Sequence, residues 1–252
     1  MANPQGTHIW YELLTSDRDA AVKFYEDVIG WTTAEFPGGH GGYIVASAGA
    51  DGAAGIMTNP APTPPVWLGY IGVDDVDASA EKIKALGGSV HFGPADIPDV
   101  GRFALVEDPQ GVKFNIMRGF SPEDSKAWNR TGLGHCCWNE LTTTDQVAAL
   151  DFYGEMFGWR KDGAMPMGEQ GDYTFLSDGE GMIGAVMNRQ GPEQPAMWNY
   201  YFRIPDLDAA LAKVRADGGK VHYEPMEVPG GERVSFCQDP QGAVFGLVEP
   251  AR

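Results

Sequence analysis

Residues 10–31 read WYELLTSDRDAAVKFYEDVIGW, and residues 138–159 read WNELTTTDQVAALDFYGEMFGW. The two segments share Trp, Glu-Leu, Asp, Ala-Ala, Phe-Tyr and Gly-Trp at a constant shift of 128 positions, without a gap. A second block repeats at a shift of 131, because residues 108–111 and 239–242 both read Asp-Pro-Gln-Gly. Solenoid repeats have periods of about 20–50 residues, so a period well above 100 indicates the duplication of a whole domain.

The length of the chain agrees with two domains of ordinary size, at 252 residues. The repeated blocks predict a first domain at residues 1–120, a linker at 121–132 and a second domain at 133–252. The linker is polar and contains Gly and Pro, which is typical of a connection between domains.

Each copy contains the same order of predicted elements twice. In the first copy, alternation over residues 7–14 predicts a strand, and a helix follows with Asp17 as its N-cap and Gly30 as its stop. Three short strands come next, and the whole strand–helix–three-strand pattern restarts at Trp67. The predicted fold class is therefore α+β: two tandem domains, each made of two βαβββ modules that form an eight-stranded, curved and partly open barrel.

The composition limits the partners of this protein. A net charge of −17 and a pI near 4.5 argue against binding to nucleic acid or to anionic membranes. The chain has three cysteines, of which Cys136 and Cys137 are adjacent, so no disulfide framework is expected. We find no targeting segment and no run of about 20 apolar residues. The predicted location is the cytoplasm, and the predicted partner is a small molecule.

The repeated motifs carry a family resemblance over essentially the whole chain. Phe24-Tyr25 with Gly30-Trp31, followed by Asp-Pro-Gln-Gly at 108–111, and the second copies of both, resemble the vicinal oxygen chelate superfamily. This superfamily includes glyoxalase I, bleomycin and fosfomycin resistance proteins and extradiol dioxygenases. The chain looks most like the fused two-domain glyoxalase-like proteins. The resemblance implies the fold but leaves isomerisation, addition, ring cleavage and plain binding open as functions.

The resemblance also implies where a metal would bind, namely at one position on the first, fifth and eighth strands of each domain. The corresponding residues here are Trp10, Leu68 and Asn115 in the first copy and Trp138, Asn199 and Gly246 in the second. Neither Trp nor Leu coordinates a hard divalent cation, and Gly has no side chain to offer. We therefore predict that this protein uses no metal and no cofactor.

Glu12 and Glu140 are the candidate catalytic residues. Each lies two positions after a Trp that faces the hollow, so strand alternation directs the carboxylate to the same side. In an aromatic hollow, a carboxylate is expected to have a raised pKa and to act as a general base or hydrogen-bond acceptor. The alternative is a structural role, in which the two carboxylates tie down a loop or pair with an arginine, with Arg102 and Arg233 as the repeated partners.

His8 offers a further alternative, since it shares a strand face with Trp10 and Glu12 and could form a metal pair with Glu12. The second copy has Cys136 in place of His8, and the sequence suggests no third ligand. The cysteines have no paired histidine at a recognisable spacing. We interpret them as small apolar thiols within strands.

Aromatic residues dominate the predicted ligand-binding set. Trp and Tyr suit a flat, partly apolar ligand that stacks on their rings. Trp67 and Trp198 have the opposite strand parity and are predicted to pack against the helices. The predicted ligand-binding residues are Trp10, Trp138, Leu68, Tyr70, Asn115, Asn199 and Tyr201.

The sequence therefore favours a metal-free small-molecule binding protein of the glyoxalase/bleomycin-resistance type, holding an aromatic or polycyclic compound. The alternative is a glyoxalase-like lyase or isomerase with Glu12 or Glu140 as general base, and a metal-dependent dioxygenase is a further alternative. Because fusion can replace dimerisation, we expect a monomer with an internal pseudo-dimer, and a weak homodimer is the second option. Because the copies differ at Leu68/Asn199 and Asn115/Gly246, the two hollows are predicted to be non-equivalent.

Overall fold

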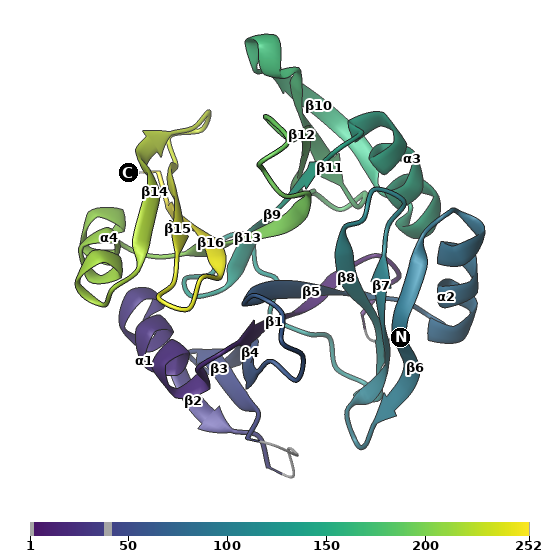
Figure 1. Cartoon of the computed structure of the whole chain (residues 1–252), viewed down its shortest axis with the longest axis horizontal. Helices are drawn as coiled ribbons and strands as arrows, with labels where there is room; N and C mark the ends of the chain where they lie inside the picture. Colours follow the sequence, from purple (N-terminus) through teal and green to yellow (C-terminus); the bar gives the residue numbers. More distant parts are fainter. Residues whose placement is uncertain (1–2, 38–41, 252) are drawn as a thin grey trace. The chain divides into compact units, whose positions relative to one another are not determined.

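A computed structural model describes residues 3–37 and 42–251 (Figure 1). The elements of the first copy are β1 His8–Thr15, α1 Arg18–Ile29, β2 Thr32–Glu35, β3 Ile44–Ala48, β4 Asp51–Thr58, β5 Val66–Gly72, α2 Val76–Ala85, β6 Ser89–Ile97, β7 Gly101–Glu107 and β8 Lys113–Gly119. Those of the second copy are β9 Cys136–Thr143, α3 Gln146–Phe157, β10 Arg160–Pro166, a short 3₁₀ helix η1 Gly168–Gln170, β11 Asp172–Ser177, β12 Met182–Asn188, β13 Met197–Arg203, α4 Leu207–Ala216, β14 Lys220–Glu227, β15 Arg233–Gln238 and β16 Val244–Glu249.

The strands form two sheets with the same topology. The first sheet has the order β2-β3-β4-β1-β5-β8-β7-β6, and the second has the order β10-β11-β12-β9-β13-β16-β15-β14. The first and last strand of each module pair in parallel, as β1 does with β4 and β5 does with β8, whereas the hairpins pair antiparallel. Neither sheet closes into a barrel. The predicted α+β fold with two tandem eight-stranded domains is confirmed.

The four α-helices of the described residues begin in the same way, with an aspartate that caps the first turn. The Asp17 carboxylate accepts a hydrogen bond from the Ala20 N–H at 3.1 Å, and Asp145 does the same for Ala148 at 3.0 Å. The cap satisfies backbone donors that have no partner within the helix. Asp75 and Asp206 cap α2 and α4 in the same manner.

By packing, the chain divides into two compact units, and neither unit is a continuous half of the sequence. Unit 1 comprises residues 1–9, 69–125 and 138–198, and unit 2 comprises residues 10–68, 126–137 and 199–252. Each unit thus combines a module from one copy of the repeat with a module from the other. The sequence boundary at 121–132 stays a prediction, because the units describe packing.

The core of unit 2 explains one of the repeated motifs. The Tyr25 hydroxyl on α1 donates to Asp239 Oδ2 at 3.1 Å and accepts from Trp67 Nε1 at 3.0 Å. The other carboxylate oxygen of Asp239 accepts three backbone N–H groups of its own turn, from residues 241–243. The Phe-Tyr motif of the first copy therefore binds the Asp-Pro-Gln-Gly turn of the second copy.

Unit 1 contains the reciprocal arrangement. The Tyr153 hydroxyl on α3 donates to Asp108 Oδ2 at 3.0 Å and accepts from Trp198 Nε1 at 3.0 Å. Trp67 and Trp198 are both buried, and each bonds to a helix residue. The prediction that these two tryptophans pack against the helices is confirmed.

Among the described residues, no helix combines the length and apolar character needed to cross a membrane.

Candidate functional site

A hydrogen-bonded Trp–Tyr–Glu triad occurs in unit 2. Trp10 on β1 donates from its indole Nε1 to the Tyr43 hydroxyl at 2.8 Å, and Tyr43 in turn shares a hydrogen bond with the Glu12 carboxylate. Glu12 is buried, and Trp10 and Tyr43 are partly exposed. Strand alternation places Trp10 and Glu12 on the face of β1 opposite Tyr11 and Leu13, which are core residues.

The same triad recurs in unit 1. Trp138 on β9 donates to the Tyr173 hydroxyl at 2.8 Å, and Tyr173 donates to Glu140 Oε2 at 2.8 Å. Phe175 lies edge-on to both rings, with centroid distances of 6.2 Å to Trp138 and 5.8 Å to Tyr173. In each copy a phenol thus orients a carboxylate.

The two triads differ in the strand beside them. Gly55 on β4 is the register partner of Glu12, and a Cβ atom there would lie 1.8 Å from the Tyr43 hydroxyl and 3.1 Å from Trp10 Nε1. Glycine is therefore required for the Tyr43 hydroxyl to lie over β4. The register partner of Glu140 is Ala185, so the second triad forms beside a side chain.

Both tyrosines are held in the neutral form. Burial raises the pKa of Tyr43 well above its ordinary value, and the negative charge of Glu12 raises it further. Burial and the Glu140 charge raise the pKa of Tyr173 in the same way. At physiological pH each phenol is a hydrogen-bond donor to the glutamate and an acceptor for the indole.

Arg102 and Arg233 are not the partners of Glu12 and Glu140. Arg102 bonds to Asp77 with N–O distances of 2.6 and 2.9 Å, and also to Asp96 at 2.8 Å. Arg233 binds Asp208 and Glu249 in the equivalent place. These arginines lie at the start of β7 and β15, where the aspartate of the neighbouring helix is in reach. Arg102 and Arg233 therefore pair with these carboxylates instead of with Glu12 and Glu140.

His8 belongs to an aromatic core instead of a metal pair. It is buried in unit 1, with its ring stacked 5.1 Å from Trp159 and edge-on to Trp198 at 6.0 Å. Burial lowers the pKa of His8 to about 3, so the imidazole is neutral at physiological pH. Because His8 is the first residue of β1, its ring reaches the core although its parity matches Trp10.

The remaining predicted ligand residues occupy neighbouring strands. Tyr70 and Asn115 are register partners on β5 and β8, and both are buried. Leu68 and Asn199 are buried as well. Tyr201 on β13 is partly exposed.

Sequence analysis missed Tyr43 and Tyr173, although they complete the triads. The two tyrosines are 130 positions apart, between the shifts of 128 and 131 that relate the flanking blocks. Aligning the loop-rich stretch between the blocks would have matched them. No local pattern indicates that a tyrosine on the third strand contacts a Trp and a Glu on the first.

The residues at the metal positions implied by the resemblance do not fit a metal. The Trp10 and Trp138 indole groups are donors only and are bonded to tyrosines. At Gly246, a Cβ atom would lie 1.9 Å from the Tyr201 ring, so that position has no room for a ligating side chain. Within residues 3–37 and 42–251, no three His, Cys, Asp or Glu side chains come together in a group that could hold a metal ion.

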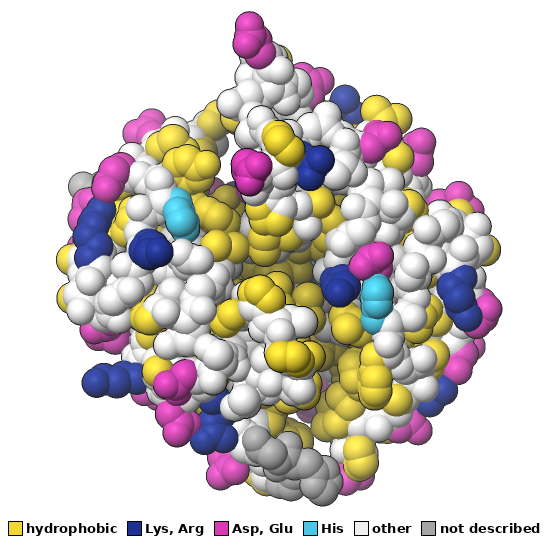
Figure 2. Space-filling model, viewed as in Figure 1, with side chains coloured by type: hydrophobic (Ala, Val, Ile, Leu, Met, Phe, Trp, Pro, Cys, Tyr) yellow, Lys and Arg dark blue, Asp and Glu magenta, His cyan; other side chains and the backbone are white. Residues whose placement is uncertain are grey.

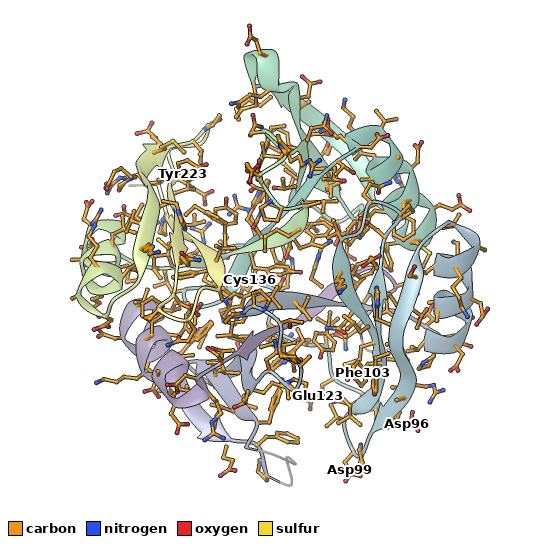
Figure 3. All side chains as sticks on the ribbon, viewed as in Figure 1. Asp96, Asp99, Phe103, Glu123, Cys136 and Tyr223 are labelled. Atoms are coloured by element: carbon orange, nitrogen blue, oxygen red, sulfur yellow. The ribbon has the colours of Figure 1, made fainter. Side chains whose placement is uncertain are left out.

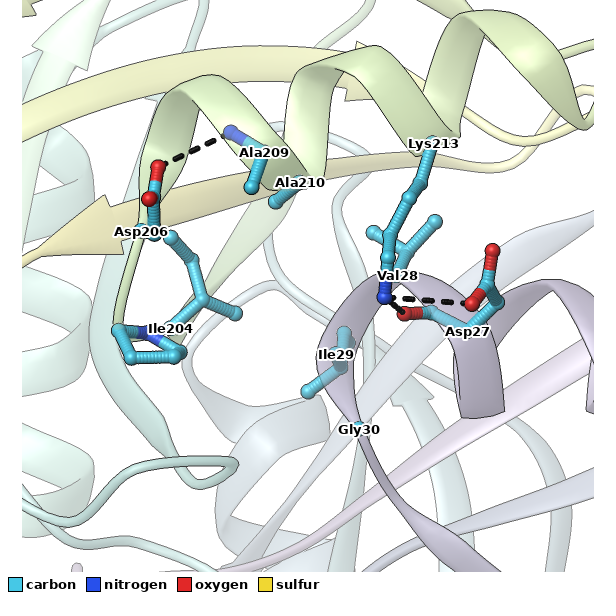
Figure 4. A pocket seen from close by; sticks show the side chains of 10 residues that line it. Asp27, Val28, Ile29, Gly30, Ile204, Asp206, Ala209, Ala210 and Lys213 are labelled. Atoms are coloured by element: carbon cyan, nitrogen blue, oxygen red, sulfur yellow. Dashed lines mark hydrogen bonds and ion pairs between the residues drawn. The ribbon is translucent and has the colours of Figure 1, made fainter.

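A shallow pocket in unit 2 lies between the end of α1 and the start of α4, with Ile29, Ile204 and Ala210 in its wall (Figure 4). Lys213 crosses it, and its Nζ donates to the Asp27 backbone oxygen at 2.7 Å. Lys213 on α4 and Asp27 on α1 already bond to each other and hold the two helices together. The pocket contains neither triad.

Three comparisons place this architecture among known proteins. Residues 8–116 and 132–247 match the family "Glyoxalase/Bleomycin resistance protein/Dioxygenase superfamily". The chain is 37% identical over 253 residues to "Putative glyoxylase CFP32" of Mycobacterium tuberculosis, with 98% of this chain and 96% of that protein covered. It is 30% identical over 268 residues to "Anthracycline biosynthesis protein DnrV" of Streptomyces peucetius, covering 97% and 93%.

The fold is also similar to that of a Mn(II)-bound glyoxalase from Novosphingobium aromaticivorans, with a TM-score of 0.66 and 17% identity, over 98% of this chain and 83% of that one. This chain belongs to the glyoxalase/bleomycin resistance protein/dioxygenase superfamily. The predicted resemblance is confirmed.

Proposed function

We propose that this protein is a metal-independent small-molecule binding protein that holds an aromatic or polycyclic compound at its Trp–Tyr–Glu triads. The observation that carries the proposal is the triad itself, which occurs in both copies with the same 2.8 Å Trp–Tyr hydrogen bond. In each copy the triad starts at the strand-one position where the family resemblance implies a metal ligand.

The chemistry of the triad suits recognition of a flat compound with a polar edge. Tryptophan and tyrosine provide large, rigid apolar surfaces for stacking. The glutamate accepts hydrogen bonds, so it favours a ligand with hydroxyl or N–H groups on its rim. The name of the relative DnrV assigns it to anthracycline biosynthesis, and anthracyclines contain planar fused rings, which supports a ligand of this class.

Tryptophan fluorescence tests the proposal. We expect 1,4-dihydroxyanthraquinone to quench the emission saturably, because Trp10 and Trp138 are part of the sites. The double variant Glu12→Gln/Glu140→Gln keeps the size of both side chains, and we expect it to bind about tenfold more weakly through loss of the charged acceptor. Unchanged affinity in the double variant, or the absence of saturable quenching in the native protein, would refute the proposal.

A second candidate function is a lyase or isomerase with Glu12 or Glu140 as general base. The Tyr173 hydroxyl bond to Glu140 Oε2 favours it, because a base must be held in a fixed orientation toward the proton that it removes. The hemithioacetal of methylglyoxal and glutathione is a suitable test substrate. Turnover that is lost in Glu12→Gln or Glu140→Gln, with the fold retained, would support an enzyme, whereas a binding protein shows no turnover in either form.

A further inference from the structure

One cross-strand row in unit 2 is almost entirely aromatic. Tyr201 on β13 is the register partner of Gly246 on β16, Gly246 is the partner of Phe236 on β15, and Phe236 is the partner of Tyr223 on β14. This row, which we call the aromatic row, therefore crosses four adjacent strands. Three inter-strand spacings correspond to about 14 Å.

Gly246 makes the row continuous. A Cβ atom at this position would lie 1.9–2.3 Å from three carbon atoms of the Tyr201 ring, so that ring lies directly over the β16 backbone. From there its centroid is 6.0 Å from that of Phe236. Gly246 stands where the family resemblance implies a metal ligand. Because it has no side chain, the Tyr201 ring has room to lie against the sheet.

The neighbouring rings of the row meet at intermediate angles. Phe236 makes angles of 38° with Tyr201, 38° with Tyr223 and 39° with His222. Rings in the core of the same unit meet mostly edge to face, as Tyr25 does with Trp67 at 87°. The rings of the aromatic row are therefore tilted against their neighbours and not perpendicular to them.

The aromatic row also reaches the surface. Tyr223, labelled on β14 in Figure 3, is 57% exposed, and Phe236 and Tyr201 are partly exposed. Core residues Cys237 and Phe245 occupy the opposite face of the same strands. In Figure 2, hydrophobic side chains gather beside an exposed histidine over β14 and β15.

The first copy provides a natural contrast. Its equivalent row on β5, β8, β7 and β6 is Tyr70, Asn115, Leu105 and Phe92. Tyr70 and Asn115 are buried, and a leucine stands where the second copy has Phe236. Phe103, labelled in Figure 3, lies next to this row on β7, with its ring 5.5 Å from that of Phe92 and 6.3 Å from that of Tyr70. The first copy thus also has an aromatic series, but its Tyr70 end is buried, whereas Tyr201 in the second copy is partly exposed.

We propose that the aromatic row of unit 2 is a stacking platform for a planar fused-ring compound. A platform four strands wide matches several fused rings better than a single ring, and the hydroxyl groups of Tyr201 and Tyr223 supply polar contacts at both ends. The inference rests on the proposed small-molecule function and deepens it by assigning the flat part of the ligand to one surface.

The chain itself offers matched variants for the experiment. Phe236→Leu introduces the residue that the first copy has at the equivalent position, and Leu105→Phe makes the reverse change in the first row. With 1,4-dihydroxyanthraquinone as probe, we expect Phe236→Leu to weaken binding about tenfold, as loss of a stacked ring does. Leu105→Phe should leave the Kd within about twofold, because Tyr70 and Asn115 of that row are buried.

The NMR signal of the Phe236 ring tests directly whether the probe binds at the aromatic row. In protein labelled with ring-¹³C phenylalanine, its signal is assigned by its absence from the Phe236→Leu spectrum. Adding the probe should shift this signal through the ring current of the stacked compound. Circular dichroism verifies that both variants are folded, and Tyr223→Ala provides a second disruption on the exposed edge strand.

The outcomes separate this inference from the proposed function. A probe that binds the native protein and is weakened by Glu12→Gln/Glu140→Gln, while Phe236→Leu has no effect and the Phe236 signal stays in place, overturns the platform alone. Weakening by both sets of variants supports both ideas. Absence of probe binding overturns both, and weakening by Phe236→Leu alone supports the platform and refutes the triads as the binding site.

Discussion

At the scale of residues, the protein uses one hydrogen-bonding pattern in two environments. A tryptophan donates to a tyrosine that contacts a carboxylate, both in the core, as Trp67–Tyr25–Asp239, and in the triads, as Trp138–Tyr173–Glu140. In the core, the carboxylate also accepts backbone N–H groups of its own turn, and burial still raises the pKa of Asp239. In the triads the aromatic partners are partly exposed. The two environments therefore differ in the exposure of the aromatic rings, which are buried in the core and partly exposed in the triads.

The core tyrosine should be important for stability. Replacing Tyr25 with Phe leaves the buried Trp67 N–H without its acceptor and removes the hydroxyl donor to Asp239 Oδ2. We expect the free energy of unfolding to fall by about 1–3 kcal/mol, measured by urea denaturation. The control Tyr223→Phe changes an exposed hydroxyl and should stay within about 0.5 kcal/mol. Equal stability of the two variants would contradict the structural role of Tyr25.

The cysteines should be unreactive in the native protein. Cys136, Cys137 and Cys237 are buried thiols outside any disulfide, and burial raises the pKa of Cys137 to about 12 and that of Cys237 to about 11. Because the thiolate is the reactive form, we expect no reaction with Ellman's reagent at pH 8. Three thiols should react once guanidinium has unfolded the chain. Rapid labelling of a native thiol would contradict the buried strand positions.

At the scale of elements, an ionic cluster joins the segment before β9 to the β14–β15 turn within unit 2. Arg130 donates to both oxygens of Glu232, at 3.1 and 2.8 Å, and Arg203 on β13 binds the same carboxylate and the Arg130 backbone oxygen. Arg203 is buried, and its equivalent in the first copy, at a shift of 131, is Gly72. Gly72 therefore cannot make, in the first copy, the side-chain contacts that Arg203 makes in the second copy.

This cluster should make stability depend on pH. Burial alone would raise the pKa of Glu232, but the hydrogen bonds and charges of Arg130 and Arg203 outweigh it and hold the pKa below its ordinary value. A lowered pKa in the folded state means that the stabilisation is complete above the unfolded pKa, near 4.5, and is lost as the pH falls through the folded value.

We expect Glu232→Gln to reduce the free energy of unfolding by about 1.5–3 kcal/mol at pH 7, since charged hydrogen bonds are lost. The difference in free energy of unfolding between variant and native protein should become smaller as the pH is lowered below about 4.5. Urea titrations at a series of pH values measure it. Glu224→Gln, at an exposed pair with Arg215, is the matched control and should have little effect. A difference independent of pH would show that the charge of Glu232 does not stabilise the fold.

At the scale of the whole molecule, the duplication gives each compact unit one module from each copy. The Phe-Tyr motif of one copy and the Asp-Pro-Gln-Gly turn of the other meet in each unit, as Tyr25 with Asp239 and Tyr153 with Asp108. These contacts join residues that are 214 and 45 positions apart. They explain why both motifs occur in both copies.

The donor set predicts the metal content of the chain. Protein purified without chelator and without a metal-affinity step should contain close to no iron, nickel or zinc by plasma mass spectrometry. Trp10, Trp138 and Gly246 offer no ligand at the positions that the family resemblance implies. About one equivalent of any of these metals per chain would show that the protein binds metal through a different set of residues.

The sequence by itself determined the duplication, the module order, the helix caps at Asp17 and Asp145, and the side of β1 from which Trp10 and Glu12 project. These features depend on local rules, namely strand alternation, side-chain capping and repeated motifs, which a single sequence displays. Only the tertiary structure decided that Tyr43 joins Trp10 and Glu12, that Arg102 binds Asp77, and that Tyr201 lies over Gly246. Such pairings depend on which strands become neighbours and in what register, and no local pattern encodes that choice.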